Sequence, residues 1–91
     1  LNSNLNFSKC LEILYLSLRQ NLLTKIRNDY FKMNKNLFSL DLSYNQIEFI
    51  EYESFITNTD LYDLNLNGNY LKSFNKNIFS PNILLTNLYL A

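Results

Sequence analysis

The chain has 91 residues, enough for one small domain, and 47% of them are hydrophobic, which is ordinary for a chain that packs a core. Eight basic and eight acidic residues give a formal net charge of zero, which argues against nucleic acid or an anionic membrane surface as a partner. No apolar run approaches the roughly 18 residues that span a bilayer, so no direct membrane insertion by this segment is expected. The start lacks a signal-peptide pattern, and we expect a piece of a longer protein.

A fixed period of 24 residues organises the sequence. Two sets of residues keep this spacing: Phe7, Phe31, Phe55 and Phe79, and Asn21, Asn45 and Asn69. Pairs of leucines separated by one residue keep it too: Leu16 and Leu18, Leu40 and Leu42, Leu64 and Leu66, Leu88 and Leu90. Each unit repeats the frame LxxLxLxxNxLxxIxxxxF, and self-similarity at such a period indicates a repeat architecture.

The predicted elements follow in chain order. Residues 1–12 are the tail of a preceding repeat, the complete repeats are 13–36, 37–60 and 61–84, and residues 85–91 start a further repeat. In each unit the LxL segment predicts a short strand, because side chains alternate along a strand and the two leucines then point to one side. Stacked units predict a parallel sheet with one buried face and an irregular or short helical return segment behind it.

The repeated asparagines, Asn21, Asn45 and Asn69, lie three residues after the second leucine of each pair. The chain must bend sharply there, which leaves backbone N–H and C=O groups inside the molecule without a ladder partner. An asparagine amide offers both donors and an acceptor. We therefore predict a structural asparagine ladder at these positions rather than a row of ligand contacts.

The phenylalanines fall on the return segment, where their rings are expected to stack from repeat to repeat. Three residues after each phenylalanine stands a polar or small residue: Cys10, Asn34, Asn58 and Asn82. Two interpretations of this column stay open. Neighbouring residues fill the space, namely Met33, Thr57, Pro81 or Ile83, or the asparagines cap a short helical turn.

The frame, with LDLSYNQIEFIEYESF from Leu40 to Phe55 as its closest stretch, resembles the leucine-rich repeat. Within that family it resembles the typical 24-residue class of extracellular animal proteins such as Toll-like receptor ectodomains. The resemblance implies an α/β solenoid, a right-handed coil with parallel strands on the concave face and irregular or short helical convex segments. The family usually has leucine in the column of Cys10, so the chain departs from the pattern on the convex side.

The sequence offers little for catalysis. It contains no histidine, the commonest general base and metal ligand, and its single cysteine, Cys10, is expected to be a small core residue. The only glycine, Gly68, falls in a turn, and no Gly-rich phosphate loop exists. We therefore expect no enzyme and no cofactor, with no catalytic, cofactor-binding or metal-binding residues.

Partner binding is expected on the outward-facing strand positions, because the frame fixes the rest and repeat proteins bind partners on concave surfaces. The candidates are Tyr15, Ser17, Arg19, Ser39, Asp41, Ser43, Tyr44, Asp63, Asn65, Asn67, Asn87 and Tyr89. Strands lie about 4.8 Å apart, so Asp41 and Asp63 on neighbouring strands predict a mildly acidic spot. Tyr and Arg, which surround it, are enriched at binding hot spots. A plain solvated surface is the alternative for any one of these side chains.

Two functions stay open. The first is a ligand-recognition segment of a secreted protein or receptor ectodomain, which binds a protein, peptide or glycan ligand on its concave face. Its extracellular or cell-surface location is implied by the resemblance, and Asn6-Phe7-Ser8 makes Asn6 a candidate glycosylation site. The second is an intracellular, cytoplasmic scaffold or regulatory array attached to a signalling or enzymatic domain outside this segment.

Overall fold

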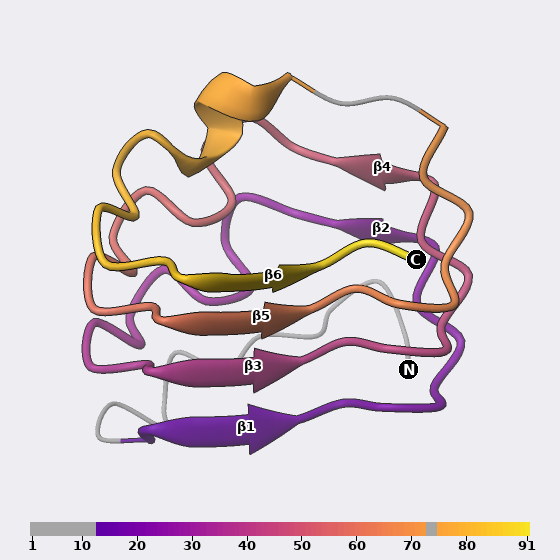
Figure 1. The fold of residues 1–91 in the computed structure, drawn as a ribbon, viewed down its shortest axis with the longest axis horizontal. Coiled ribbons are helices and arrows are strands. Elements are labelled where there is room, and N and C mark those ends of the chain that lie inside the picture. Colours follow the sequence, from indigo (N-terminus) through magenta and orange to yellow (C-terminus); the bar gives the residue numbers. More distant parts are fainter. Residues whose placement is uncertain (1–12, 73–74) are drawn as a thin grey trace.

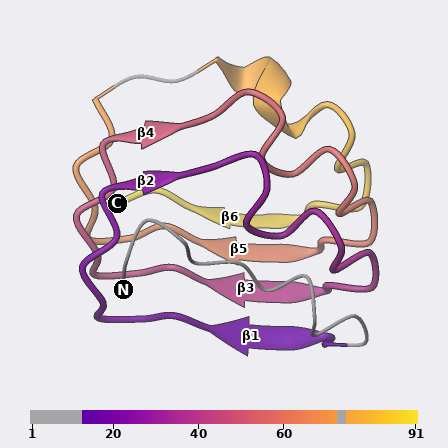
Figure 2. The same ribbon diagram turned by 180° about the vertical axis from the view of Figure 1, so that it is seen from behind.

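The computed structural model describes residues 13–72 and 75–91. Four short strands, one from each repeat, form a parallel sheet (Figure 1). In sheet order they are β1 (Tyr15–Ser17), β3 (Ser39–Asp41), β5 (Asp63–Asn65) and β6 (Asn87–Tyr89). A second parallel sheet, seen from the other side in Figure 2, contains β2 (Lys25–Ile26) and β4 (Phe49–Ile50). After β5 the chain forms a 3-10 helix, η1 (Lys76–Phe79).

Residues that pair between neighbouring strands are one sequence period, 24 residues, apart along the chain. Leu16 pairs with Leu40, Leu40 with Leu64, and Leu64 with Leu88. The second sheet keeps the same spacing, since Ile26 pairs with Ile50. Each segment therefore lies beside the equivalent segment of the next repeat, and the repeats stack in sequence order (Figure 1).

The leucines of the LxL segments form the core of the stack. The four in the second and third described repeats are at most 1% exposed: Leu40, Leu42, Leu64 and Leu66. Asp41 and Asn65, which stand between them, are only half-buried because alternate side chains of a strand point to opposite faces. Burying one leucine contributes about 1.5–3 kcal/mol, so this alternation fixes which face of the sheet turns inward.

Asparagine side chains bond the backbone where the chain leaves the strands. Asn45 Nδ2 donates to the carbonyl oxygens of Leu18 and Leu42, both at 3.0 Å, and Asn45 Oδ1 accepts from the N–H of Leu23 at 3.1 Å. Asn69 makes the equivalent three bonds one repeat later, at 2.9 to 3.0 Å. These amides tie each bend to the bend of the preceding repeat.

Phenylalanine rings stack behind the strands. The rings of Phe31 and Phe55 lie 6.0 Å apart at an interplanar angle of 8°, and those of Phe55 and Phe79 lie 5.9 Å apart at 24°. Phe31 and Phe55 are fully buried. Ring pairs of this kind add about 0.5–1.5 kcal/mol beyond the burial of their area, and the stack joins the return segments of successive repeats.

A second column of buried asparagines lies beside the rings: Asn34, Asn58 and Asn82. Asn58 Nδ2 donates to the carbonyl oxygens of Phe31 and Asn34 at 3.0 and 2.9 Å. Asn82 Nδ2 donates to those of Phe55 and Asn58 at 3.0 and 2.8 Å. The Oδ1 atoms of Asn58 and Asn82 accept no hydrogen bond. The return segments are therefore also linked by amide-to-backbone bonds.

This column corrects both interpretations of the return segment. The expectation that Met33 or Ile83 fills the space is wrong, because these side chains are 43% and 83% exposed while the asparagine amides occupy the interior. Thr57 and Pro81 are half-buried beside them. The capping interpretation has the right kind of bond but the wrong partner, since the amides of Asn58 and Asn82 bond the turn of the preceding repeat. The helix η1 is capped by Asn75, whose Oδ1 accepts from the N–H of Asn77 at 2.9 Å.

Expectations that concern Asn6, Phe7 and Cys10, like the whole tail 1–12, lie outside the described residues. Within the described ranges, no helix has the length and apolar character needed to cross a membrane.

Candidate partner-binding face

The outward side of the β1-β3-β5-β6 sheet, called the strand face below, carries the side chains predicted to bind a partner. Eleven of the twelve are exposed or half-buried: Tyr15, Ser17, Arg19, Ser39, Asp41, Tyr44, Asp63, Asn65, Asn67, Asn87 and Tyr89. Ser43 is 0% exposed, so the prediction that it contacts a partner is wrong. Its Oγ donates to Asp41 Oδ1 at 2.6 Å and accepts from Arg19 Nη1 at 3.3 Å. Ser43 instead positions the side chains of its neighbours.

Two carboxylates are fixed on the strand face. Asp41 Oδ1 also accepts from the N–H of Ser43 at 2.9 Å, and Asp63 Oδ2 accepts from Ser39 Oγ at 3.0 Å. The register pairs Asp63 with Ser39 and Asp41 with Asn65, so the carboxylates are offset along neighbouring strands rather than directly opposed. Because the partners in these bonds are neutral, the two aspartates give the strand face a mildly acidic patch.

An arginine and a tyrosine form a second feature at the end where the chain leaves the strands. Arg19 Cζ lies 4.6 Å from the centroid of the Tyr44 ring, within the range of a cation–π interaction. Tyr44 adopts a φ of 57° in the left-handed region, as does Gln20 at 57°, and Gly68 has a φ of 71°. The three residues are equivalent positions of successive repeats, so the same unusual bend recurs along this edge.

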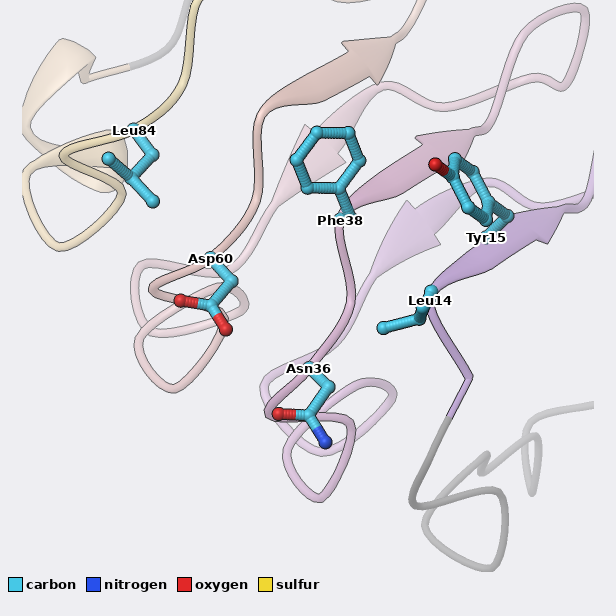
Figure 3. A pocket seen from close by; sticks show the side chains of 6 residues that line it. All are labelled: Leu14, Tyr15, Asn36, Phe38, Asp60 and Leu84. Carbon is cyan, nitrogen blue, oxygen red and sulfur yellow. The ribbon is translucent and has the colours of Figure 1, made fainter.

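Six residues line a pocket of about 320 Å³ at the opposite end, where the chain enters the strands (Figure 3). We call it the entry pocket; its lining residues are Leu14, Tyr15, Asn36, Phe38, Asp60 and Leu84. Tyr15 alone among them belongs to the predicted partner-binding residues. The entry pocket therefore adjoins the strand face but is built from other positions of the repeat.

Aromatic rings form a continuous row at this entry edge. The rings of Tyr15 and Phe38 meet edge to face at 5.9 Å, and those of Phe38 and Tyr62 stack at 5.0 Å with an interplanar angle of 4°. Backbone bonds set their spacing, since the N–H of Phe38 donates to the carbonyl of Leu14 and the N–H of Tyr62 to that of Phe38, both at 2.8 Å. Phe38 and Tyr62 are thus equivalent positions of successive repeats, and Tyr15 directly follows the equivalent position of the preceding repeat, Leu14.

A family model of the leucine rich repeat matches residues 11–71. The chain belongs to the leucine-rich repeat family. A comparison with curated proteins gave no match. The parallel strands and the scarcity of helix among the described residues fit the leucine-rich repeat fold. Domains of this family generally bind proteins, which indicates that the chain is a protein-interaction module.

The leucine-rich repeat frame did not by itself identify the entry pocket, because the frame leaves the relevant positions unspecified. A signal was nonetheless present in the sequence. Directly after the first apolar residue of each complete repeat stands a second apolar residue: Leu14, Phe38 and Tyr62. A column that repeats its apolar character outside the core positions indicates an exposed apolar strip.

Within the described residues of this leucine-rich repeat chain, no group of three or more His, Cys, Asp or Glu residues lies in a position to hold a metal ion. Burial raises the pKa of Tyr30, Arg27 lowers it, and Asp29 and Glu51 raise it. Tyr30 lies on the return segment after β2, so this shift bears on stability rather than on the strand face.

Proposed function

We propose that the chain is a non-catalytic ligand-recognition segment of a secreted protein or of a cell-surface receptor ectodomain. In this proposal the repeats coil into a right-handed solenoid, and the strand face is its concave, ligand-binding side. The observation that carries the proposal is the division of each strand into buried leucines and an outward set of polar and aromatic side chains. That outward set is not needed for the core and is available for a protein, peptide or glycan ligand.

The hydrogen bonds on the strand face support recognition rather than a merely solvated surface. Ser43 and Ser39 hold the carboxylates of Asp41 and Asp63 in fixed positions, and Tyr44 is held beneath Arg19. Side chains that are already ordered lose less conformational entropy when a ligand binds. The neutral net charge and the acidic patch favour a ligand other than nucleic acid.

The extracellular location rests on the resemblance to the 24-residue class and on the sequon at Asn6. It is tested by expressing the parent protein in animal cells and comparing the mass of the wild type with that of Asn6→Gln before and after deglycosylation. A glycan that disappears in the variant supports secretion. An unmodified Asn6 on a parent protein that stays in the cytosol supports the intracellular scaffold instead.

The binding face is tested by site-specific crosslinking in the parent protein. A photoreactive phenylalanine analogue replaces Tyr89 on the strand face or, as a matched control, Tyr52 on the return segment after β4, both of which are solvent-exposed tyrosines. We expect a discrete crosslinked partner from position 89 and none from position 52. Equal labelling from both positions would contradict binding on the strand face.

The acidic patch gives the second arm of this experiment. The double substitution Asp41→Ala and Asp63→Ala should reduce the crosslink from position 89. Because Asp41 Oδ1 is the acceptor for the N–H and the hydroxyl of the buried Ser43, a modest loss of melting temperature is also expected, and the crosslink is compared at a temperature where both proteins are folded. A drop in melting temperature with an unchanged crosslink assigns the two aspartates to the fold and removes them from the binding face.

A further inference from the structure

We propose that the entry pocket binds an arginine side chain presented by a partner protein. The pocket adjoins the strand face and shares only Tyr15 with it, and the choice of a protein as the carrier of the arginine rests on the function proposed above. Its walls combine two kinds of group. Leu84, Asp60 and Asn36 follow one another along one side, and Phe38, Tyr15 and Leu14 lie along the other (Figure 3).

The aromatic side offers an open ring surface. Phe38 and Tyr62 are each 37% exposed although they stack on one another, and Tyr15 extends the row with most of its side chain in solvent. Leu14 and Leu84 beside them are about half exposed. A row of exposed apolar and aromatic side chains from several repeats marks an interaction surface rather than scattered surface residues.

The charge of the pocket selects the class of side chain that fits it. Asp60 supplies a carboxylate and Asn36 an amide, and the six lining residues include no lysine or arginine. Within the described residues, Asp60 forms neither a hydrogen bond nor an ion pair through its side chain. A cation is attracted both by a carboxylate and by the face of an aromatic ring. The complementary group is therefore positively charged and able to lie against rings.

Among the described residues, a cation–π contact is present elsewhere in the chain but not at the entry pocket. At the exit edge, the guanidinium of Arg19 lies 4.6 Å from the Tyr44 ring centroid. At the entry edge, Phe38 and Tyr62 form a parallel stack beside a carboxylate, but no cation of the described chain lies over them. Arginine fits better than lysine because its planar guanidinium stacks on rings and also meets a carboxylate with two parallel N–H groups.

The size and position of the pocket favour an arginine carried by a protein. A volume of about 320 Å³ is at the lower end for a complete small-molecule site but is sufficient for one long side chain. Tyr15 belongs to both the entry pocket and the strand face. A polypeptide that lies across the sheet therefore reaches the pocket with a side chain at the point where the chain enters β1.

The test is an NMR titration of the chain with three probes: acetyl-Leu-Arg-Leu-amide, its citrulline counterpart, and maltotriose. Citrulline keeps the shape of arginine without the charge. We expect the arginine peptide to shift the ring resonances of Phe38 and Tyr62 and to bind about fivefold or more tightly than the citrulline peptide. Equal affinities would overturn the proposal, as would ring shifts produced by maltotriose alone or the lack of ring shifts with every probe.

Variants assign the effect to the pocket. Asp60→Asn keeps the size of the side chain and should weaken the arginine peptide about fivefold with little effect on the citrulline peptide. Asp29→Asn, which removes an exposed carboxylate outside the pocket, is the matched control and should leave both affinities unchanged. Arginine binding that survives Asp60→Asn overturns the site. Asp41→Ala with Asp63→Ala should retain peptide binding, which separates this pocket from the strand face.

Discussion

The ring of Tyr44 lies against the backbone of Gly68, the equivalent position one repeat later. A Cβ atom built on Gly68 would stand 2.5 Å from Tyr44 Cδ1 and 2.8 Å from Tyr44 Cε1. The ring is therefore held between Gly68 and the guanidinium of Arg19. The single glycine of the chain leaves room for the Tyr44 ring to reach the next repeat at the edge of the strand face.

Gly68→Ala should destabilise the protein by about 1–3 kcal/mol. Two causes add, because the φ of 71° is strained for alanine and the new methyl group displaces the Tyr44 ring. Urea denaturation of the single variants Gly68→Ala and Tyr44→Ser and of the double variant measures the two parts. The double variant should lose less stability than the sum of the single variants, because the clash between the methyl group and the ring is gone. The loss caused by the strained φ at position 68 should remain. Strict additivity of the single effects would show that the ring and the methyl group do not meet.

Asn45→Ala should cost about 1–3 kcal/mol of unfolding free energy. The change removes the acceptor of the buried Leu23 N–H as well as a donor to two carbonyl groups. Asn21→Ala is the matched comparison, because Asn21 is half-buried and donates to the Leu18 carbonyl at 2.9 Å. Chemical denaturation should rank the loss at Asn45 above that at Asn21. The reverse order would contradict a ladder whose strength depends on burial.

The raised pKa of Tyr30 predicts a loss of stability at alkaline pH. Its folded pKa lies above the ordinary value of 10.0, chiefly because burial disfavours the phenolate. The folded state thus holds the proton more tightly, so this contribution is fully present below the unfolded pKa and is lost as pH rises through the folded pKa. Melting temperatures measured from about pH 8 to pH 11 should fall less for Tyr30→Phe than for the wild type. Parallel curves for the two proteins would exclude Tyr30 as the source.

The strands and their register follow from the sequence because one physical requirement sets both. Leu40 and Leu64 keep the same place in successive repeats, and the LxL alternation leaves only one way to bury them. The structure pairs these leucines directly. The family itself could be inferred for the same reason, since the repeated frame is the pattern of residues that the core needs.

The alternation of inward and outward side chains gave a wrong prediction at Ser43, whose side chain is buried by hydrogen bonds to neighbouring side chains. Ser43 follows Leu42, and the strand alternation predicts that it faces outward with Asp41. Its hydroxyl instead bonds the Asp41 carboxylate two residues earlier, and Arg19 covers it from the neighbouring repeat. A sequence pattern describes the direction of the strand but not the local turn that begins at its end.

The return segments and the entry pocket were hidden for a different reason. Asn58 occupies a position where the family usually has leucine, and only the structure shows that its amide reaches the preceding turn. Phe38 and Tyr62 stand at an unspecified position of the frame, and their stacking depends on backbone spacing across two repeats. Both features arise from contacts between neighbouring repeats. The residue pattern of a single repeat does not specify these contacts.

Substitution by leucine distinguishes the stability contributions of the two asparagine columns, represented by Asn58 and Asn45. Asn58 Nδ2 donates to the carbonyls of Phe31 and Asn34, but each of these carbonyls also accepts a backbone N–H, from Asn34 at 3.0 Å and from Leu37 at 3.2 Å. Leucine would leave those backbone bonds in place. It would also remove the buried Asn58 Oδ1, which accepts no hydrogen bond. Losing the amide hydrogen bonds lowers stability, whereas removing the unsatisfied Oδ1 raises it. We therefore expect the unfolding free energy to change by no more than about 1 kcal/mol for Asn58→Leu.

The same substitution at Asn45 should behave differently. Asn45 Oδ1 accepts the bond from the Leu23 N–H, and a leucine there leaves that buried donor unsatisfied at a cost of about 1–3 kcal/mol. Urea denaturation of Asn58→Leu and Asn45→Leu, which change the same groups in two buried columns, measures the difference directly. A large loss at Asn58 would mean that its two donated bonds outweigh the unmet acceptor. The asparagines of the return segment would then be as necessary to the stack as those of the ladder.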